Sequence, residues 1–281
     1  MDIQKELAKI FKGELEADEQ TREFYSHDAS LFELKPDVVG YPKDADDLKA
    51  VVNFVNQHKK ANPNLSITPR SRGTDMSGGA IGDSILLDVS KHMTKLVNVS
   101  SKQATVQPGM MYKDFEVETL KHGSLLPSYP ASRDMASVGG MFSNNAGGEK
   151  SLEYGKTDNF VTELKMVLSD GNEYVVKPLT KAELVRKMSQ GDFEGNLYKK
   201  TFELLDEHYD EIQAAKPNVS KDSTGYHLWN VWNRETGIFD LTKLFVGAQG
   251  TLGLISEGTV KLVPHREHSG LLVMLDRKSV V

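Results

Sequence analysis

The hydrophobic pattern of the first ninety residues predicts a strand, a helix and two further strands. Apolar side chains recur at positions 48, 51, 52 and 55, the spacing that gives a helix one buried face. Asp44 is placed to cap this helix, with Asp47 placed for a capping box, and Pro63 stops it. β-prone runs flank the helix at 38–42, 65–67 and 85–89. Residues 36–90 are therefore expected to form a β-α-β unit.

The rest of the chain alternates short strands, helices and long stretches without a period. A helix is expected at Ile3–Phe11, where apolar residues again share one face. Further strands are expected at 96–99, 104–106, 162–168, 174–176, 254–262 and 271–275. A further helix is expected at 112–121, and residues 181 to about 212 are expected to be helical, with Asn196 as a candidate cap for a helix at Leu197–His208. The segment around Trp229 and Trp232 is either a loop or a short helix.

The turn after the strand at 65–67 is rich in Gly, Ser and Thr, and we call residues 70–79 the nest loop. Glycine permits positive φ, which lets consecutive backbone N–H groups converge on an anion. Two arginines within the turn, Arg70 and Arg72, could add charge-assisted hydrogen bonds. The pattern is neither a Walker loop nor the dinucleotide fingerprint, because a strand follows it. It is either a phosphate-binding nest or a Gly-rich hairpin turn, and the β-α-β context favours the nest.

A second stretch without a period runs from residue 126 to residue 148. It contains two prolines near its start and two Gly-Gly pairs, Gly139-Gly140 and Gly147-Gly148. These small residues suit a backbone that lies flat against a planar or extended ligand. The alternative is a buried helix start packed tightly at its glycines, but the Gly-Gly pairs and prolines argue against a plain core helix.

Composition narrows the class of protein. The 281 residues carry a formal net charge of -6, which argues against nucleic acid as the main partner. The chain has no cysteine, so disulfides and Cys-ligated metal centres are excluded within it. No apolar run approaches a bilayer span, and the N-terminus lacks the pattern of a signal peptide. A cytoplasmic protein without a membrane span is expected.

Six short motifs resemble the FAD-linked oxidases of the vanillyl-alcohol oxidase and p-cresol methylhydroxylase superfamily. Within it, the branch of D-lactate dehydrogenase and the glycolate oxidase flavin subunit fits best. The motifs are Tyr25–Ser30, Pro69–Gly79, Ser137–Gly140 with Asn145–Gly148, Tyr154–Thr157, Thr224–Tyr226 and Gly247–Gly253. Each alone is weak, but they occur in the family's order and at compatible spacing over residues 22–264.

The resemblance implies an α+β fold with FAD between two α+β subdomains, roughly residues 1–108 and 109–264. It also implies that the C-terminal cap domain of the family is absent, with 265–281 as the start of a truncated cap domain or a linker. The nest loop would bind the pyrophosphate, and the other motifs would line the flavin, the ribityl chain and the adenosine. The cofactor-binding residues so implied are Arg70, Ser71, Arg72, Gly73, Thr74, Asp75, Met76, Ser77, Pro127, Pro130, Ser132, Ser137, Val138, Gly139, Gly140, Asn144, Asn145, Ala146, Gly147, Thr157, Val161, Gly250, Gly253 and Ile255.

The chain departs from the family pattern in the nest loop and near residue 249. Small residues are usual where Ser71 and Arg72 stand; Arg72 could pair with the pyrophosphate or point towards Asp75 or solvent, and we favour the phosphate. Gln249 stands where glutamate is common, so no charged contact is carried over there. Where some relatives attach flavin through histidine, this chain has Thr74, so the FAD is expected to be noncovalent.

The family reaction is oxidation of a small 2-hydroxy acid such as D-lactate or glycolate, with hydride passing to flavin N5. The electrons then pass to an acceptor such as a quinone or an iron–sulfur protein. The cap domain of relatives supplies the base and often a metal site, so neither a catalytic residue nor a metal is assigned here. His227 follows the Thr224–Tyr226 motif and is the histidine to test, although a packing role is favoured.

Two other functions remain open from the sequence. One is a flavin-binding or electron-transfer module without turnover of its own. The other is an enzyme similar to UDP-N-acetylenolpyruvoylglucosamine reductase, which shares the fold and is of similar size. The Thr224–Tyr226 motif and the Gly247–Gly253 segment fit that reductase poorly.

Overall fold

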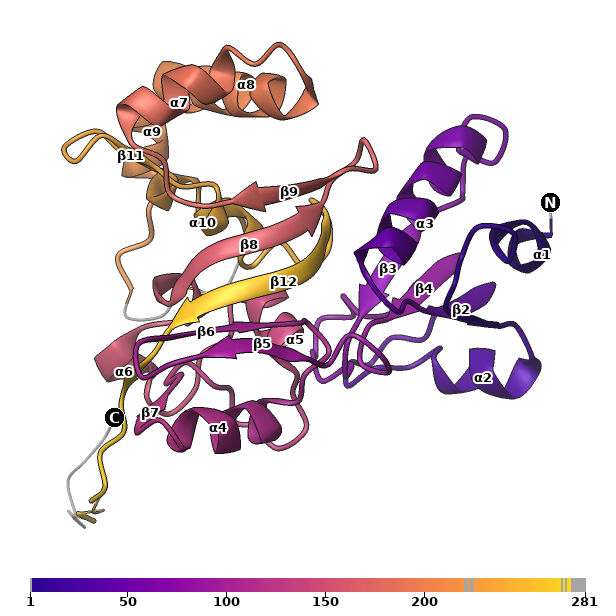
Figure 1. Ribbon diagram of the computed structural model, residues 1–281, viewed down its shortest axis with the longest axis horizontal. Helices are drawn as coiled ribbons and strands as arrows, with labels where there is room; N and C mark the ends of the chain where they lie inside the picture. The colour runs from indigo at the N-terminus through magenta and orange to yellow at the C-terminus, as the bar shows by residue number, and fades with distance from the viewer. Residues whose placement is uncertain (1, 220–221, 223–224, 269, 271, 274–281) are drawn as a thin grey trace.

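The computed structural model of the chain describes residues 2–219, 222, 225–268, 270 and 272–273. In these residues the backbone forms two lobes, each built on its own sheet, with long loops meeting between them (Figure 1). The first sheet has the strand order β1-β2-β4-β3 and the second has the order β5-β6-β12-β8-β9. The expected α+β class is confirmed.

The first lobe is a small mixed sheet with three helices beside it, within the described residues. Its strands are β1 (Glu14–Glu16), β2 (Val38–Tyr41), β3 (Ile67–Arg70) and β4 (Ile85–Asp88). Its helices are α1 (Ile3–Leu7), α2 (Glu19–Phe24) and α3 (Ala45–His58). Strands β2 and β3 both pair with β4 in parallel, which confirms the β-α-β unit. Because β3 and β4 are parallel, the nest loop between them is not a hairpin turn.

The start of α3 departs from the sequence-based expectation in one respect. Asp44 caps the helix as expected, and its carboxylate accepts from the backbone N–H groups of Asp46 and Asp47. The expected capping box is wrong. The Asp47 carboxylate accepts instead from the N–H of Lys12 at 2.7 Å and of Lys43 at 2.9 Å, so it ties α3 to the N-terminal segment. Helix α1 is also shorter than expected: it ends at Leu7, and a turn over residues 8–10 leads to the buried Phe11.

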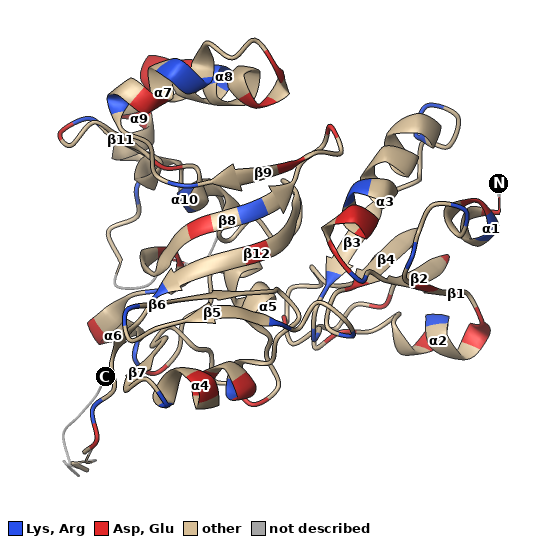
Figure 2. Cartoon of the chain, in the orientation of Figure 1, with Lys and Arg blue, Asp and Glu red and all other residues tan. Residues whose placement is uncertain are grey.

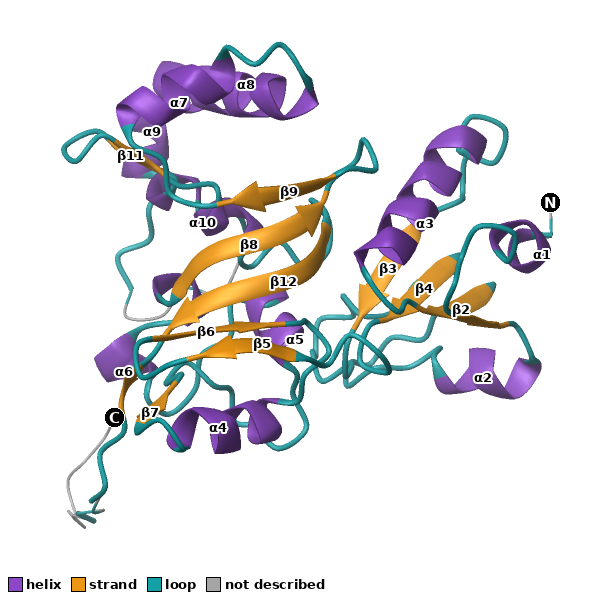
Figure 3. Cartoon of the chain, viewed as in Figure 1, coloured by secondary structure: helices purple, strands orange, loops and turns teal. Residues whose placement is uncertain are grey.

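The second lobe is an antiparallel sheet flanked by helices (Figure 3). Its main strands are β5 (Leu96–Val99), β6 (Gln103–Val106), β8 (Val161–Val167), β9 (Glu173–Val176) and β12 (Leu254–Lys261). Short strands are β7 (Ser124–Leu125), β10 (Trp232–Asn233), β11 (Ile238–Phe239) and β13 (Val263–Pro264). The hairpin β5–β6 pairs with β12, so the change of sheet falls between Asp88 and Leu96, ahead of the expected boundary near residue 108.

Among the described residues, the second lobe contains one long helix, α8, and several short ones. They are α4 (Tyr112–Leu120), α5 (Val138–Ser143), α6 (Ser151–Tyr154), α7 (Lys181–Met188), α8 (Phe193–Glu207), α9 (Tyr209–Ala214) and α10 (Thr242–Phe245), with 3₁₀ turns at Thr157–Asn159 and Leu228–Asn230. The helical region expected over 181–212 is confirmed as α7, α8 and most of α9, and the chain breaks between α7 and α8 at Gly191, where φ is +71°. Asn196 is not a cap; the Asp192 side chain caps α8 through the N–H of Gly195 at 2.7 Å.

Several other expectations can be compared with the described residues. Trp229 lies in a 3₁₀ turn and Trp232 in the short strand β10. Most of the strand expected at 271–275 lies outside the described residues. Residues 272 and 273, which are described, are not in a strand. No helix among the described residues is long and apolar enough to cross a bilayer. Charges of both signs mark the outer helices α2, α4, α7 and α8 (Figure 2).

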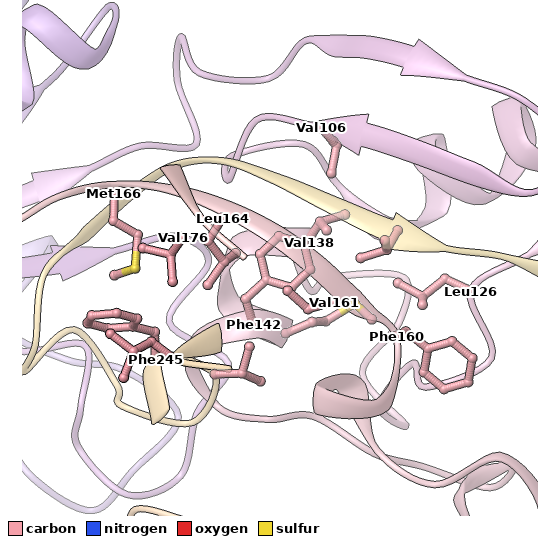
Figure 4. Close-up of a cluster of buried hydrophobic side chains, with 14 of the residues drawn as sticks. Val106, Leu126, Val138, Phe142, Phe160, Val161, Leu164, Met166, Val176 and Phe245 are labelled. Carbon is pink, nitrogen blue, oxygen red and sulfur yellow. The ribbon is translucent and has the colours of Figure 1, made fainter. Parts of the chain in front are cut away.

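The two lobes have separate cores that touch where α3 meets the second sheet. The larger core packs Phe142 of α5 against Val161 and Leu164 of β8, with Phe245 of α10 nearby (Figure 4). The smaller core belongs to the first lobe but also contains Val167 and Leu254 of the second sheet. The Asn56 side-chain amide donates to the carbonyl of Ser169 at 2.7 Å beside this contact. Helix α3 therefore fixes one lobe against the other.

Candidate functional site

A cavity of about 720 Å³ lies between the lobes and is the main candidate site. Its volume is in the range of small-molecule and cofactor pockets. The segments that form its walls are the nest loop, residues 130–132, residues 136–146 around α5, and residues 249–255. Its floor is apolar and includes Leu48, Leu87 and Leu254. A polar rim over an apolar floor suits a ligand that carries both phosphates and an aromatic ring.

Two glycines of the nest loop have the left-handed backbone conformation. Gly73 has φ +63° and Gly78 has φ +85°, values that favour glycine. The Gly73 carbonyl accepts from the N–H of Ala29 at 3.0 Å, so the loop rests on the preceding 25–30 segment. The Asp75 carboxylate accepts from the backbone N–H and the hydroxyl of Ser77, which closes a local turn.

The two arginines of the nest loop have different environments. Arg70 is buried, and its Nη1 donates to backbone carbonyls of the surrounding loops. Burial lowers the pKa of the Arg70 guanidinium, and the nearby Asp88 carboxylate opposes that shift. Arg72 is exposed, lines the cavity, and makes no ion pair or hydrogen bond within the described part of the chain. Arg72 is therefore free to contact an anionic ligand, and it is not paired with Asp75.

The opposite wall brings small residues of α5 to the nest loop. A Cβ placed at Gly140 would lie 3.4 Å from the hydroxyl of Ser71 and 3.5 Å from that of Ser137. The Ser137 hydroxyl is buried and has no hydrogen-bond partner among the described residues. Buried polar groups are normally satisfied, so this hydroxyl at the cavity wall indicates a polar ligand.

Residues 249–250 close the cavity from the second lobe. Gly250 has φ +78° and approaches Pro69 of β3 so closely that a Cβ there would lie 2.3 Å from the proline ring. Gln249 also has a positive φ, +50°, and its side chain lies between Ser77 and Asn144. This segment brings the second sheet against the strand that leads into the nest loop.

Most of the residues predicted for the site line this one cavity. Those that do are Arg70, Ser71, Arg72, Gly73, Thr74, Asp75, Met76, Ser77, Pro130, Ser132, Ser137, Gly139, Gly140, Asn144, Ala146, Gly250 and Ile255. Residues separated by as many as 185 positions, from Arg70 to Ile255, thus meet in space. The motifs Pro69–Gly79, Ser137–Gly140 with Asn145–Gly148, and Gly247–Gly253 therefore contribute to one cavity, whereas Tyr25–Ser30 and Tyr154–Thr157 do not line it and Thr224 lies outside the described residues.

Seven predicted residues do not line the cavity: Pro127, Val138, Asn145, Gly147, Thr157, Val161 and Gly253. The Thr157 hydroxyl donates to the carbonyl of Ala146 at 2.8 Å, and the Asn145 side-chain oxygen accepts from the N–H of Asp158 at 3.0 Å. Val138 and Val161 belong to the larger core.

Further residues line the cavity that were not among the predicted cofactor-binding residues, although Pro69, Gly79 and Gln249 lie within the motifs. The additional lining residues are Leu48, Pro69, Gly79, Ala80, Leu87, Val89, Pro108, Ala131, Ala136, Met141, Ser143, Gln249 and Leu254. Leu48 and Leu87 have the pattern of ordinary core residues, so no local signal marks them as lining. His227 does not line the cavity; it pairs with Asp222 at 3.2 Å and stacks on Trp229, in keeping with a packing role.

Comparison with known families identifies the class of protein. Residues 36–177, half of the chain, match the FAD binding domain family. The chain belongs to this family, and FAD is its cofactor. The matched segment contains the nest loop and α5, the two sides of the cavity.

Individual proteins of known name are similar over nearly the whole chain. D-2-hydroxyglutarate dehydrogenase of Pseudomonas putida is 29% identical over 93% of this chain and 26% of its own length. Glycolate oxidase subunit GlcD of Bacillus subtilis is 28% identical over 98% of this chain and 47% of its own length. The chain thus spans between a quarter and a half of these relatives.

A solved structure shows the same fold. Alkyldihydroxyacetonephosphate synthase superposes with a TM-score of 0.62 at 18% identity, over 94% of this chain and 40% of that chain. At this identity the likeness concerns the fold, which is that of a p-cresol methylhydroxylase-type FAD-binding domain. The nest loop, the unpartnered Ser137 hydroxyl and the apolar floor fit the phosphate, polar and ring portions of FAD.

Proposed function

We propose that the cavity between the lobes binds FAD noncovalently, with its pyrophosphate at the nest loop. The main observation in support is that the nest loop and α5, which belong to different lobes, form the two sides of one cavity. The noncovalent state is supported by the chemistry of the lining. It contains no histidine or tyrosine among the described residues, and the chain has no cysteine. Those side chains are the nucleophiles that a covalent flavin link requires.

We further propose that the chain is the FAD-binding part of an oxidoreductase that acts on a small 2-hydroxy acid. The support is the similarity to proteins named D-2-hydroxyglutarate dehydrogenase and glycolate oxidase subunit. Bound FAD would supply the hydride acceptor, while the protein orients it and limits access of water. D-lactate, glycolate and D-2-hydroxyglutarate are the candidate substrates.

The lining of the cavity favours cofactor binding over complete turnover by this chain alone. Its titratable side chains among the described residues are Arg70, Arg72 and Asp75. The Asp75 carboxylate already accepts two hydrogen bonds from Ser77, so it is a poor candidate for the base that removes the hydroxyl proton. We therefore propose that the base comes from outside this lining. A flavin-binding module without turnover is the second candidate function.

The first test is the visible absorption spectrum of the purified chain before and after acid precipitation. Flavin absorption that moves to the supernatant on precipitation is the expected result. Absorption that stays with the pellet would overturn noncovalent binding, and a chain that fails to take up added FAD would overturn the site itself.

The second test measures reduction of dichlorophenolindophenol by the three hydroxy acids. Dye reduction by one acid would support the oxidoreductase and exclude the simple module. A flavin-loaded chain that none of the acids reduces would favour the module. Oxidation of NADPH would instead favour the reductase alternative.

A further inference from the structure

Arg70 occupies a position beneath the nest loop that joins three separate backbone segments. Its Nη1 donates to the carbonyl of His27 at 2.7 Å, of Ala80 at 3.3 Å and of Tyr25 at 3.4 Å. Arg70 itself ends β3 at the start of the loop, and Ala80 lies just after its end. One nitrogen atom therefore holds both ends of the loop and the 25–27 segment beside it.

The guanidinium is also enclosed by its neighbours. It lies 5.1 Å from the ring centre of Tyr25, whose hydroxyl donates to the carboxylate of Asp88 at 2.7 Å. Asp88 in turn accepts from the N–H and hydroxyl of Ser90. On the loop side, a Cβ at Gly73 would lie 2.6 Å from Nη2. Arg70 is thus packed between a buried polar network and the backbone of the loop.

No carboxylate forms an ion pair with Arg70 among the described residues, so its charge is met mainly by backbone carbonyls. A buried charge without an ionic partner is costly, and such groups are retained where they serve a purpose. Lysine could not replace this arrangement, because an ammonium is a point donor and lacks the planar fork of arginine.

We propose that Arg70 is a positioning residue that preforms the nest loop before the dinucleotide binds. This inference rests on the proposed FAD site and deepens it. In this proposal the hydrogen bonds of Arg70 Nη1 keep the nest loop ordered. The loop's N–H groups and Arg72 make the direct contacts with the phosphates.

Hydrogen exchange in the FAD-free chain separates positioning from direct contact, since no phosphate is present to be contacted. We expect Arg70→Lys to speed exchange of the amides at 71–79 by at least tenfold while those of α8 keep their rates. FAD affinity, measured by quenching of flavin fluorescence, should fall at least tenfold. Its salt dependence should be unchanged, because lysine keeps the positive charge, whereas Arg72→Ala should reduce that dependence.

Arg234→Lys is the matched control. Arg234 also stacks on aromatic rings, Tyr209 and Trp232, and bonds Asp206, but it lies far from the cavity lining. It should leave both exchange at 71–79 and FAD affinity unchanged. If Arg70→Lys does not fold, Tyr25→Phe provides the second variant, because it keeps the guanidinium and removes only the bond to Asp88. Tyr25→Phe should also speed amide exchange at 71–79, but by less than Arg70→Lys.

Two results would overturn the proposal. One is weaker FAD binding in Arg70→Lys with unchanged exchange at 71–79, which would show direct phosphate contact instead. The other is unchanged exchange and unchanged affinity. A wild-type chain that does not bind FAD would defeat the proposed function. The hydrogen-exchange comparison would still test whether Arg70 orders the nest loop, because it uses the FAD-free chain.

Discussion

Gly73 lies directly against the side chain of Arg70, and a Cβ at Gly73 would be 2.6 Å from Nη2 of that arginine. Gly73 also has φ +63°, so a side chain there is unfavourable for two separate reasons. The first is backbone strain, and the second is displacement of the guanidinium from the carbonyls that it holds. The second reason connects this position to the cavity.

Gly73→Val should abolish retention of flavin without unfolding the chain. The left-handed backbone should cost about 1–2 kcal/mol of stability, and the collision with Arg70 should distort the nest loop. Gly191→Val is the control, because Gly191 has φ +71° but nothing within 4 Å of its Cβ position. Both variants should lose thermal stability by circular dichroism, Gly73→Val the more because of the collision with Arg70, and only Gly73→Val should lose flavin on gel filtration. Normal flavin content in Gly73→Val would contradict the nest assignment.

Arg72→Ala should weaken FAD binding by about 1.5–3 kcal/mol, the range for a hydrogen bond to a charged group. Arg72 is exposed at the cavity and has no ion pair within the described residues, so its loss should not destabilise the fold. Arg186→Ala removes an equal charge from an exposed position of α7 and serves as the control. Titration of each FAD-free chain with FAD measures the effect. Equal affinities in the two variants would mean that Arg72 does not contact the phosphates.

The sequence predicted the local elements best where a short-range rule decides the structure. The Asp44 cap and the parallel β2-α3-β3 order follow from capping and hydrophobic spacing. Residues 181–212 are largely helical as predicted, but the cap of α8 is Asp192 and not Asn196, and the break at Gly191 was overlooked. The role of Asp47 could not be predicted, because its partner Lys12 lies 35 residues away.

The candidate site was predictable to the extent that its residues have unusual composition. Clusters of glycine and serine marked the nest loop and α5, and both line the cavity. Leu48 and Leu254 could not be distinguished from core residues, because leucine is equally suited to packing in a core and to lining an apolar cavity. The burial of Arg70 under its own loop was also hidden, because a sequence shows a charge but not which carbonyls surround it.

Gln249 joins the two sides of the cavity, and its replacement should shorten the residence of FAD. Its side-chain oxygen lies 3.5 Å from the hydroxyl of Ser77, and its side-chain nitrogen lies 3.4 Å from the side-chain oxygen of Asn144. These contacts are long, so Gln249→Ala should raise the dissociation rate only a few-fold. Stopped-flow displacement of FAD would measure it.

Gln249→Glu should weaken FAD binding more than Gln249→Ala does. The Ser77 hydroxyl already donates to Asp75, so a glutamate would place a second carboxylate beside the first. Repulsion between two charges about 4 Å apart in water costs about 1 kcal/mol, or roughly fivefold in affinity. Asp75→Asn in the same chain should recover most of that loss. If the changes in FAD binding free energy of the two single variants simply add in the double variant, the two side chains do not interact.

The contact between α3 and the β8–β9 turn should control the width of the cavity. Gly171, in that turn, has φ +80°, and a Cβ there would lie 2.3 Å from the side-chain oxygen of Asn53 on α3. Val167 and Leu254 of the second sheet pack in the same core as α3, and Leu254 also forms the cavity floor. Gly171→Ala should displace the exposed Asn53 side chain from this contact and weaken FAD binding by no more than a few-fold. Gly237→Ala is the control for strain, since Gly237 has φ +70° and open space around its Cβ position. Asn53→Ala combined with Gly171→Ala removes the collision and should restore affinity to that of Asn53→Ala alone. If affinity stays low in the double variant, the effect of Gly171→Ala comes from backbone strain and not from the docking of the lobes.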